Sequence, residues 1–237
     1  LRAVNAGIVI VIAAGNSGAA NPMYPALYAQ DPTYKGQIIA VGATDSTNTI
    51  TSFSDLAGTA KANYLVAPGK DIYTTHNNGT YVTVSGTSFS APYVAGAAAL
   101  LKQRFPLLTA TQIVSLLLST ATDLGAVGTD AIYGRGLLNI STALSPLGWI
   151  TIPLPDGTNP AIIDSRYELG PAFGNALTAE IALTGVVGLD SWSRAFPLDL
   201  RGGVVASPSA QSGMLAGFVR GDQSETIGTP TGDTELS

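Results

Sequence analysis

The sequence predicts an α/β fold built on a mainly parallel β-sheet covered by helices, and two stretches carry this prediction. Residues 8–14 form an unbroken apolar, largely β-branched run, which is typical of a strand buried on both faces of a parallel sheet. Residues 84–101 predict a strand, a tight turn and a helix. Because this helix is apolar all round, we expect it at the centre of a core.

The composition limits the class of protein. A chain of 237 residues can bury a sizeable core, and its length suits one domain plus an appendage. Its net charge of −5 leaves no basic patch to hold phosphates, which argues against a nucleic-acid partner. The absence of cysteine excludes disulfides and cysteine metal sites. Few lysines among many Gly, Ser, Thr and Asn residues are typical of an exported bacterial protein.

The amino-terminal residues 1–7 predict the last turns of a helix that Gly7 ends in a left-handed conformation. The strand at residues 8–14 follows at once, so this unit is interpreted as the second half of a βαβ crossover. The start of the helix is not in the sequence. We therefore expect that a further segment of the sheet precedes Leu1.

Asn16 follows the first predicted strand, at the edge of the sheet where ligand-binding groups gather in open α/β folds. Asn beside Gly is common in turns, so a purely local role is one interpretation. The other is an amide donor aimed at an oxyanion. The residues alone do not decide between them.

The stretch at residues 84–92 raises a similar choice. Gly86 permits a sharp turn, Ser88 falls on the first helical turn with its hydroxyl free, and Pro92 is early enough for its missing N–H to cost little. Thr87 or Ser88 could simply cap the helix. An esterase nucleophile elbow fits less well, because it requires Gly at position 90 and a later His, and no His follows Ser88.

Further elements follow in order. Residues 37–44 predict a second apolar strand, and Thr109 with Gln112 forms a capping box. The helix after this box has a stripe that can lie on the sheet: Ile113, Leu116, Leu117 and Leu118.

Several of these segments together resemble the subtilases, the subtilisin-like serine proteases. Gly86-Thr87-Ser88-Phe89-Ser90-Ala91-Pro92 is similar to their nucleophile segment, although Tyr93 stands where the family usually has His. Ala13-Ala14-Gly15-Asn16, Tyr24-Pro25-Ala26, Ala67-Pro68-Gly69 and Tyr133-Gly134-Arg135-Gly136 follow in family order. The resemblance covers residues 1–146, the expected carboxyl-terminal part of a peptidase domain.

The resemblance implies a three-layer α/β/α sandwich and a secreted or bacterial surface serine endopeptidase that acts on proteins or peptides. In it, Ser88 is the nucleophile, and the Asn16 amide and the Ser88 N–H hold the oxyanion. Calcium is the metal ion that the family implies, and no cofactor is evident in the sequence itself. Met23 would form an apolar floor for the side chain before the cut bond. The expected substrate-binding residues are Ala14, Gly15, Met23, Gly86 and Thr87.

The single histidine, His76, does not fit the family's general base. It lies in the polar turn 74–79, whereas the subtilase His opens a buried helix within a His-Gly-Thr motif that is absent here. Asp45, Asp55 and Asp71 also lack the Asp-Thr/Ser-Gly context of the triad acid. The resemblance therefore implies that the triad His and Asp lie upstream of Leu1. The chain alone is predicted to be inactive.

Two other functions remain open. A sedolisin-type carboxyl-serine protease shares the fold and a similar Gly-Thr-Ser segment but has an acid where Asn16 stands. A non-catalytic surface protein could keep the scaffold for adhesion or secretion, with His and Asp missing from the other half. The upstream sequence would separate these alternatives.

The character of the chain changes at Leu147. Residues 147–202 predict a β-rich extension, with exposed strands near residues 162–167 and two more between residues 186 and 200 around Trp192. Residues 203–237 are rich in Gly, Ser, Thr and Pro, as in a linker or disordered tail. This extension resembles the segment that joins subtilase passengers to a downstream membrane barrel domain in bacterial autotransporters.

Overall fold

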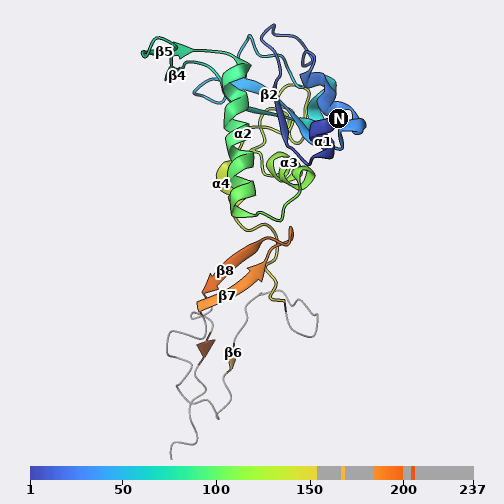
Figure 1. Cartoon of the computed structure of the whole chain (residues 1–237), viewed down its shortest axis with the longest axis vertical. Helices are drawn as coiled ribbons and strands as arrows, with labels where there is room; N and C mark the ends of the chain where they lie inside the picture. Colours follow the sequence, from blue (N-terminus) through green and yellow to red (C-terminus); the bar gives the residue numbers. More distant parts are fainter. Residues whose placement is uncertain (154–166, 169–183, 200–203, 206–237) are drawn as a thin grey trace, which may run out of the picture. The chain divides into compact units, whose positions relative to one another are not determined.

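The protein divides into two compact units, Leu1–Leu147 and Gly148–Ser237 (Figure 1). The structure is a computed structural model and describes residues 1–153, 167–168, 184–199 and 204–205. The two units are described separately.

The first unit is built on a three-stranded sheet of strands β1, β2 and β3. These span Ile10–Ala13, Ile38–Thr44 and Tyr64–Pro68. Both pairings are parallel, and β2 lies in the middle with all seven of its residues buried. The prediction of an α/β fold with a parallel sheet is confirmed.

One face of this sheet packs against short 3₁₀ helices. Side chains at alternate strand positions, such as Ile38, Ala40, Tyr64 and Val66, form a buried cluster with alanines of these connections. The helices that cover this face are η1 (Ala26–Gln30) and η3 (Gly58–Asn63), and η2 (Pro32–Tyr34) follows η1.

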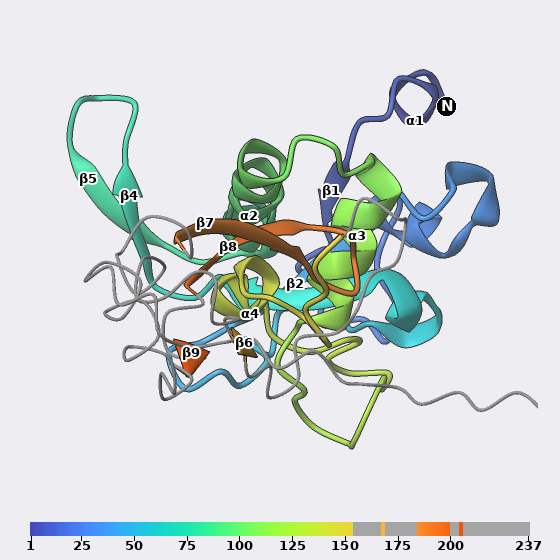
Figure 2. The same ribbon diagram turned by 90° about the horizontal axis from the view of Figure 1, so that it is seen from below.

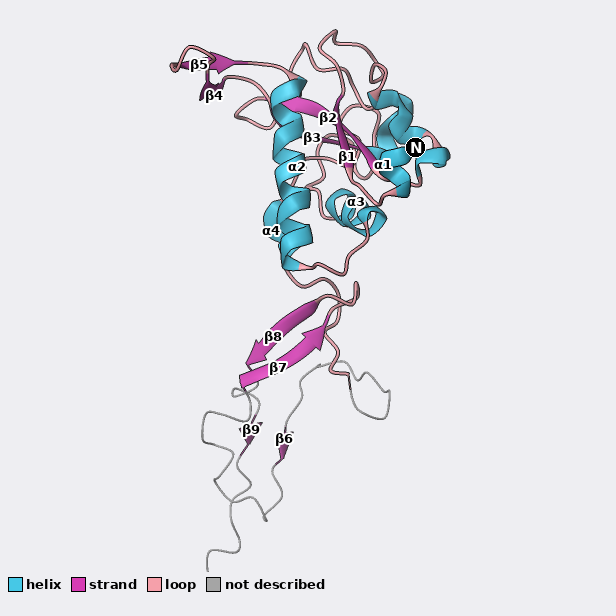
Figure 3. Ribbon diagram, viewed as in Figure 1, coloured by secondary structure: helices cyan, strands magenta, loops and turns pink. Residues whose placement is uncertain are grey.

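The opposite face is covered by α2 (Thr87–Arg104), which packs across all three strands (Figure 3). Helices α3 (Ala110–Ser119) and α4 (Ile140–Leu144) contact α2 and each other. The first unit thus has three layers, and 3₁₀ helices make up one outer layer.

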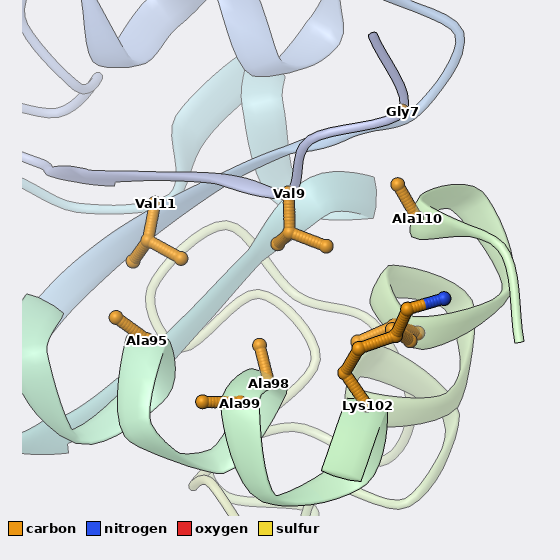
Figure 4. A pocket seen from close by; sticks show the side chains of 9 residues that line it. Gly7, Val9, Val11, Ala95, Ala98, Ala99, Lys102 and Ala110 are labelled. Atoms are coloured by element: carbon orange, nitrogen blue, oxygen red, sulfur yellow. The ribbon is translucent and has the colours of Figure 1, made fainter. Parts of the chain in front are cut away.

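Two burial predictions are wrong for the described residues. Strand β1 is half-buried rather than enclosed on both faces, and α2 is buried along one side only. Val94 and Leu101 on α2 are fully buried, whereas Tyr93 and Leu100 are 42% and 46% exposed. A pocket of about 360 Å³ lies between β1, α2 and α3, and Val9, Val11, Ala95 and Ala99 are among the residues that line it (Figure 4). An Ala- and Gly-rich helix has too little polar contrast to reveal beforehand which side is covered.

The strand predicted before Ser88 exists, but it does not join the parallel sheet. β4 (Ile72–Thr75) and β5 (Tyr81–Val84) pair antiparallel with each other. Their hairpin projects away from the rest of the first unit (Figures 1 and 2). Its turn was expected from the polar residues 74–79.

Local signals at the helix ends are confirmed. Helix α1 (Arg2–Asn5) is followed by Gly7 with φ of +68°. Gln112 donates its backbone N–H to the Thr109 hydroxyl (3.2 Å) and accepts the Thr109 N–H through its side-chain oxygen (2.8 Å). All four residues of the predicted apolar stripe of α3 are buried: Ile113, Leu116, Leu117 and Leu118.

In the second unit, β7 (Thr184–Leu189) and β8 (Ala195–Asp199) form an antiparallel pair on either side of Trp192, as predicted. The turn between them holds a buried ion pair, with 2.6 Å between Arg194 Nη2 and Asp190 Oδ2. Short strands β6 (Tyr167–Glu168) and β9 (Val204–Val205) pair in parallel.

Two sequence predictions lie largely outside the described residues. These are the exposed strands near residues 162–167 and the tail 203–237. Within the part of the chain that the structure describes, no helix has both the length and the apolar character to cross a bilayer.

We expect Thr109→Ala to lower the free energy of unfolding by about 1 kcal/mol, because it removes the side-chain acceptor at the start of α3. Chemical denaturation followed by circular dichroism would measure this. Ser115→Ala is the control, since Ser115 is exposed in the middle of the same helix and should lose nothing. Equal effects of the two substitutions would contradict a role for the capping box.

Candidate active site

Two segments far apart in the sequence meet beside the sheet: the loop after β1 and the first turn of α2. Asn16 Oδ1 accepts the backbone N–H of Thr87 (2.8 Å) and its hydroxyl (3.0 Å). The Thr87 hydroxyl in turn accepts the backbone N–H of Gly15 (3.3 Å). Thr87 is fully buried and Asn16 is exposed, so the two bonds between them are partly buried. We call this set of bonds the Asn16–Thr87 clasp.

The clasp leaves one end of the Asn16 side chain free. Oδ1 is occupied by Thr87, while Nδ2 makes no hydrogen bond to any described residue. Nδ2 lies beside Gly86, because a Cβ placed on that glycine would be 3.5 Å from it. Asn16 is solvent-exposed, so its amide N–H groups can donate to a ligand.

Ser88 is the second residue of α2 and is also exposed. Neither its hydroxyl nor its backbone N–H is hydrogen-bonded within the described residues. Gly86 occupies the position before the helix and has no side chain to cap it, and the first helical N–H, that of Thr87, donates to Asn16 Oδ1 instead. Pro92 lies inside α2 and has no N–H, so it cannot donate to the Ser88 carbonyl as a helical residue would. Because the Ser88 hydroxyl makes no hydrogen bond to the described residues, it does not cap α2.

Gly15 and Met23 lie against each other next to Asn16. Gly15 has φ of +121° and is buried, and a Cβ there would lie 2.9 Å from Met23 Cγ. Met23 donates its backbone N–H to the Ala14 carbonyl (2.8 Å), and its side chain is 54% exposed. The structure therefore brings Ala14, Gly15 and Met23 together with Asn16.

Asp55 has a place here that its sequence context did not indicate. It is 1% exposed, and its Oδ1 accepts the backbone N–H groups of Ser17 and Ala19, both at 2.9 Å. The Tyr64 hydroxyl donates to the Asp55 carbonyl (2.7 Å), and burial raises the pKa of Tyr64, so this donor stays protonated. The available signal was a carboxylate directly after the Phe53-Ser54 segment in a chain with few charges.

The other candidate acids and the histidine lie elsewhere. His76 is exposed at the turn of the β4–β5 hairpin, with Nδ1 3.0 Å from Asn78 Oδ1. Asp45 accepts backbone N–H groups of Thr47 and Thr49 in its own exposed loop. Asp71 is exposed beside Ser85, whose hydroxyl accepts its backbone N–H (2.9 Å).

Calcium was implied by the resemblance alone. Over the described ranges, no three His, Cys, Asp or Glu side chains gather closely enough to hold a metal ion. Those side chains therefore do not fit a carboxylate-rich calcium site.

Comparisons with known proteins identify relatives of the first unit. The model of the Subtilase family matches residues 1–136. Subtilisin DY of Bacillus licheniformis is 41% identical over 146 residues, covering 60% of this chain and 48% of the relative. Subtilisin Savinase of Lederbergia lenta is 42% identical over 141 residues, with the same two coverages.

Two further similarities are informative. Serotype-specific antigen 1 of Mannheimia haemolytica is 39% identical over 153 residues, which are 61% of this chain and 16% of that protein. Among solved structures, the prenylagaramide maturation protease PagA superposes with a TM-score of 0.51 at 30% identity, covering 60% of this chain and 51% of its own.

The α/β fold and the matched relatives show that the chain is built like the α/β serine peptidases. Within that class, the chain belongs to the subtilase family, since the family model matches more than half of its residues. The chain spans about half the length of the curated subtilisins it matches.

Proposed function

We propose that the chain is the carboxyl-terminal part of the catalytic domain of a serine endopeptidase that cleaves proteins or peptides. The observation that carries this proposal is the Asn16–Thr87 clasp, because it fixes a free amide donor beside the exposed Ser88 at the start of α2. A nucleophile and an oxyanion donor must be held in this way to act on one carbonyl group.

In the proposed reaction, Ser88 Oγ attacks the carbonyl carbon of the scissile peptide bond and passes its proton to a general base. The carbonyl oxygen becomes an oxyanion, which accepts hydrogen bonds from Asn16 Nδ2 and the Ser88 N–H. Collapse of the tetrahedral intermediate breaks the C–N bond, and the leaving amine takes the proton from the base. Water then releases the acyl group from Ser88 by the same steps.

The general base and the acid that orients it are proposed to lie upstream of Leu1. Three observations support this: the only histidine is exposed on a projecting hairpin, Asp55 is used by the loop after β1, and the matched subtilisins are about twice as long as the matched region. Without these groups, the Ser88 hydroxyl has no base to activate it, and residues 1–237 alone are predicted to be inactive.

The substrate is proposed to lie along Ala14, Gly15, Gly86 and Thr87. In this arrangement, the side chain before the cut bond contacts Met23. Its partly exposed thioether, packed against Gly15, favours an apolar side chain there. The protein is proposed to be secreted or on the cell surface, which fits its low charge content and its similarity to a bacterial antigen.

The two alternatives differ from this proposal in specific residues. A sedolisin-type mechanism requires an acid where Asn16 donates its amide, and Asn cannot replace a carboxyl group as a proton donor. A non-catalytic scaffold would not need a nucleophile left free of hydrogen bonds. The labelling experiment below separates this last alternative from the proposal.

Ser88→Ala in the complete protein is expected to abolish reaction with a fluorophosphonate probe, because the probe bonds only to an activated serine oxygen. Mass spectrometry of the labelled wild type should place the adduct on Ser88. Ser90→Ala, which removes a buried hydroxyl on the same helix, is the control and should still be labelled. An adduct on another serine, or a folded wild type that stays unlabelled, would rule out the nucleophile.

Asn16→Ala is expected to lower kcat by about 10²- to 10³-fold, the loss typical of removing one oxyanion donor from a subtilisin, with little change in KM. The reason is that the amide acts where charge develops in the transition state. Steady-state kinetics on a peptide substrate measures both constants. A raised KM with kcat intact would instead make Asn16 a ground-state binding residue.

His76→Ala is expected to leave kcat/KM within a few-fold of the wild-type value, because the imidazole is exposed and bonded to its own turn. The same peptide assay tests this, with Asn78→Ala as a matched change in the turn. A loss as large as that of Ser88→Ala would make His76 the general base and overturn the upstream assignment.

A further inference from the structure

Asp55 is the one buried carboxylate of the first unit that holds the loop carrying Asn16. We propose that Asp55 is a positioning residue for the oxyanion donor, acting through the backbone on the Asn16 amide without touching substrate. This inference rests on the proposed function for its catalytic consequence. Its structural part, that Asp55 fixes the loop, does not depend on whether the protein is a peptidase.

Asp55 forms hydrogen bonds with residues that flank Asn16 on both sides in the sequence. Its Oδ1 accepts the N–H groups of Ser17 and Ala19, both at 2.9 Å, on the carboxyl-terminal side. Its own N–H donates to the Gly15 carbonyl (3.0 Å) on the amino-terminal side. The backbone of Asn16 is thus fixed by Asp55, while its side-chain oxygen is fixed by Thr87.

Asp55 is itself anchored in the core of the unit. The Tyr64 hydroxyl donates to its carbonyl (2.7 Å), and the Ser54 hydroxyl lies 3.2 Å from the same oxygen. Ser54 Oγ also accepts the backbone N–H of Ala43, in the central strand (3.0 Å). The position of the loop is therefore set through the fully buried central strand of the sheet, as a preorganised site requires.

The buried Asp55 carboxylate is an energetically unfavourable acceptor for the N–H groups of a loop. Its second oxygen, Oδ2, is buried without any hydrogen-bond partner among the described residues. A buried, incompletely satisfied charge destabilises a fold. Oδ2 also packs so closely on Gly15 that a side chain at that position would overlap it. The unfavourable burial of the Asp55 carboxylate is explained if its charge strengthens the two hydrogen bonds that Oδ1 accepts from the loop.

Substitutions can separate the effect of the Asp55 charge from the effect of its hydrogen-bonding geometry. Asp55→Asn keeps an oxygen that can accept both N–H groups and places an NH₂ where Oδ2 lies. Asp55→Ala removes the acceptor. Asp45→Ala is the matched control, because Asp45 accepts two backbone N–H groups in a loop that does not carry Asn16, at 2.9 and 3.1 Å.

In the complete protein, Asp55→Ala is expected to lower kcat about tenfold to a hundredfold with little change in KM, the scale of a displaced catalytic group. Asp55→Asn should recover part of this loss, because it keeps the acceptor oxygen but loses the charge, and Asp45→Ala should match the wild type. For each variant, kcat is divided by the fraction of molecules that a fluorophosphonate labels at the end of the reaction. This normalisation excludes unfolded protein from the comparison. If Asp55→Ala fails to fold, Asp55→Ser, too short to hold both bonds, takes its place.

Amide hydrogen exchange of Ser17 and Ala19 gives a second measurement that needs no activity. Both amides should exchange faster in Asp55→Ala than in the wild type and Asp55→Asn, whereas the amides of β2 should be unchanged. Faster exchange in a protein that the probe never labels would reject the proposed function and leave the loop assignment standing. Unchanged exchange, or a kinetic loss confined to KM, would overturn the positioning role.

Discussion

The contact between Asn16 and Thr87 joins residues 71 positions apart, and the geometry of the candidate site depends on it. It can form only if the loop after β1 and the start of α2 reach the same edge of the sheet. The parallel order β1-β2-β3 ensures this, because it aligns the carboxyl ends of the strands, and α2 packs across all three. The bond from Gly15 N–H to the Thr87 hydroxyl then joins the backbone of the loop to the same residue.

The sequence predicted those parts of the fold and site whose local pattern has one physical solution. The β-branched run and the second apolar strand predicted parallel pairing, and Thr109 with Gln112 predicted the start of α3. The motif around Ser88 located the turn into α2 because Gly, Ser and Pro each have a narrow range of tolerated positions there. For the same reason, Asn16 could be singled out before its partner was known.

The features that the sequence did not predict depend on tertiary contacts. The apolar pattern of α2 is uniform, so it could not show that Val94 is buried while Leu100 is exposed. The strand before Ser88 has an ordinary β pattern, which does not distinguish a projecting hairpin from a sheet strand. Asp55 was judged only as a triad acid, and its context excluded that role. Its bonds to Ser17 and Ala19 join residues more than 35 positions apart, so no local sequence pattern indicates them.

Among the described residues, Asp55 and Asp190 are buried carboxylates whose charges are compensated in different ways. Asp190 has Arg194 beside it, with nitrogens of the guanidinium at 2.6 and 2.9 Å from Oδ2, so its charge is paired within one turn. Asp55 has no cation in hydrogen-bond contact among the described residues, and only backbone N–H groups oppose its charge. The hydrogen bonds that the Asp55 carboxylate accepts are therefore directed at the backbone of the loop. In the proposed reaction, an acceptor that binds only the backbone holds the loop and leaves the neutral Asn16 amide free to donate to the oxyanion.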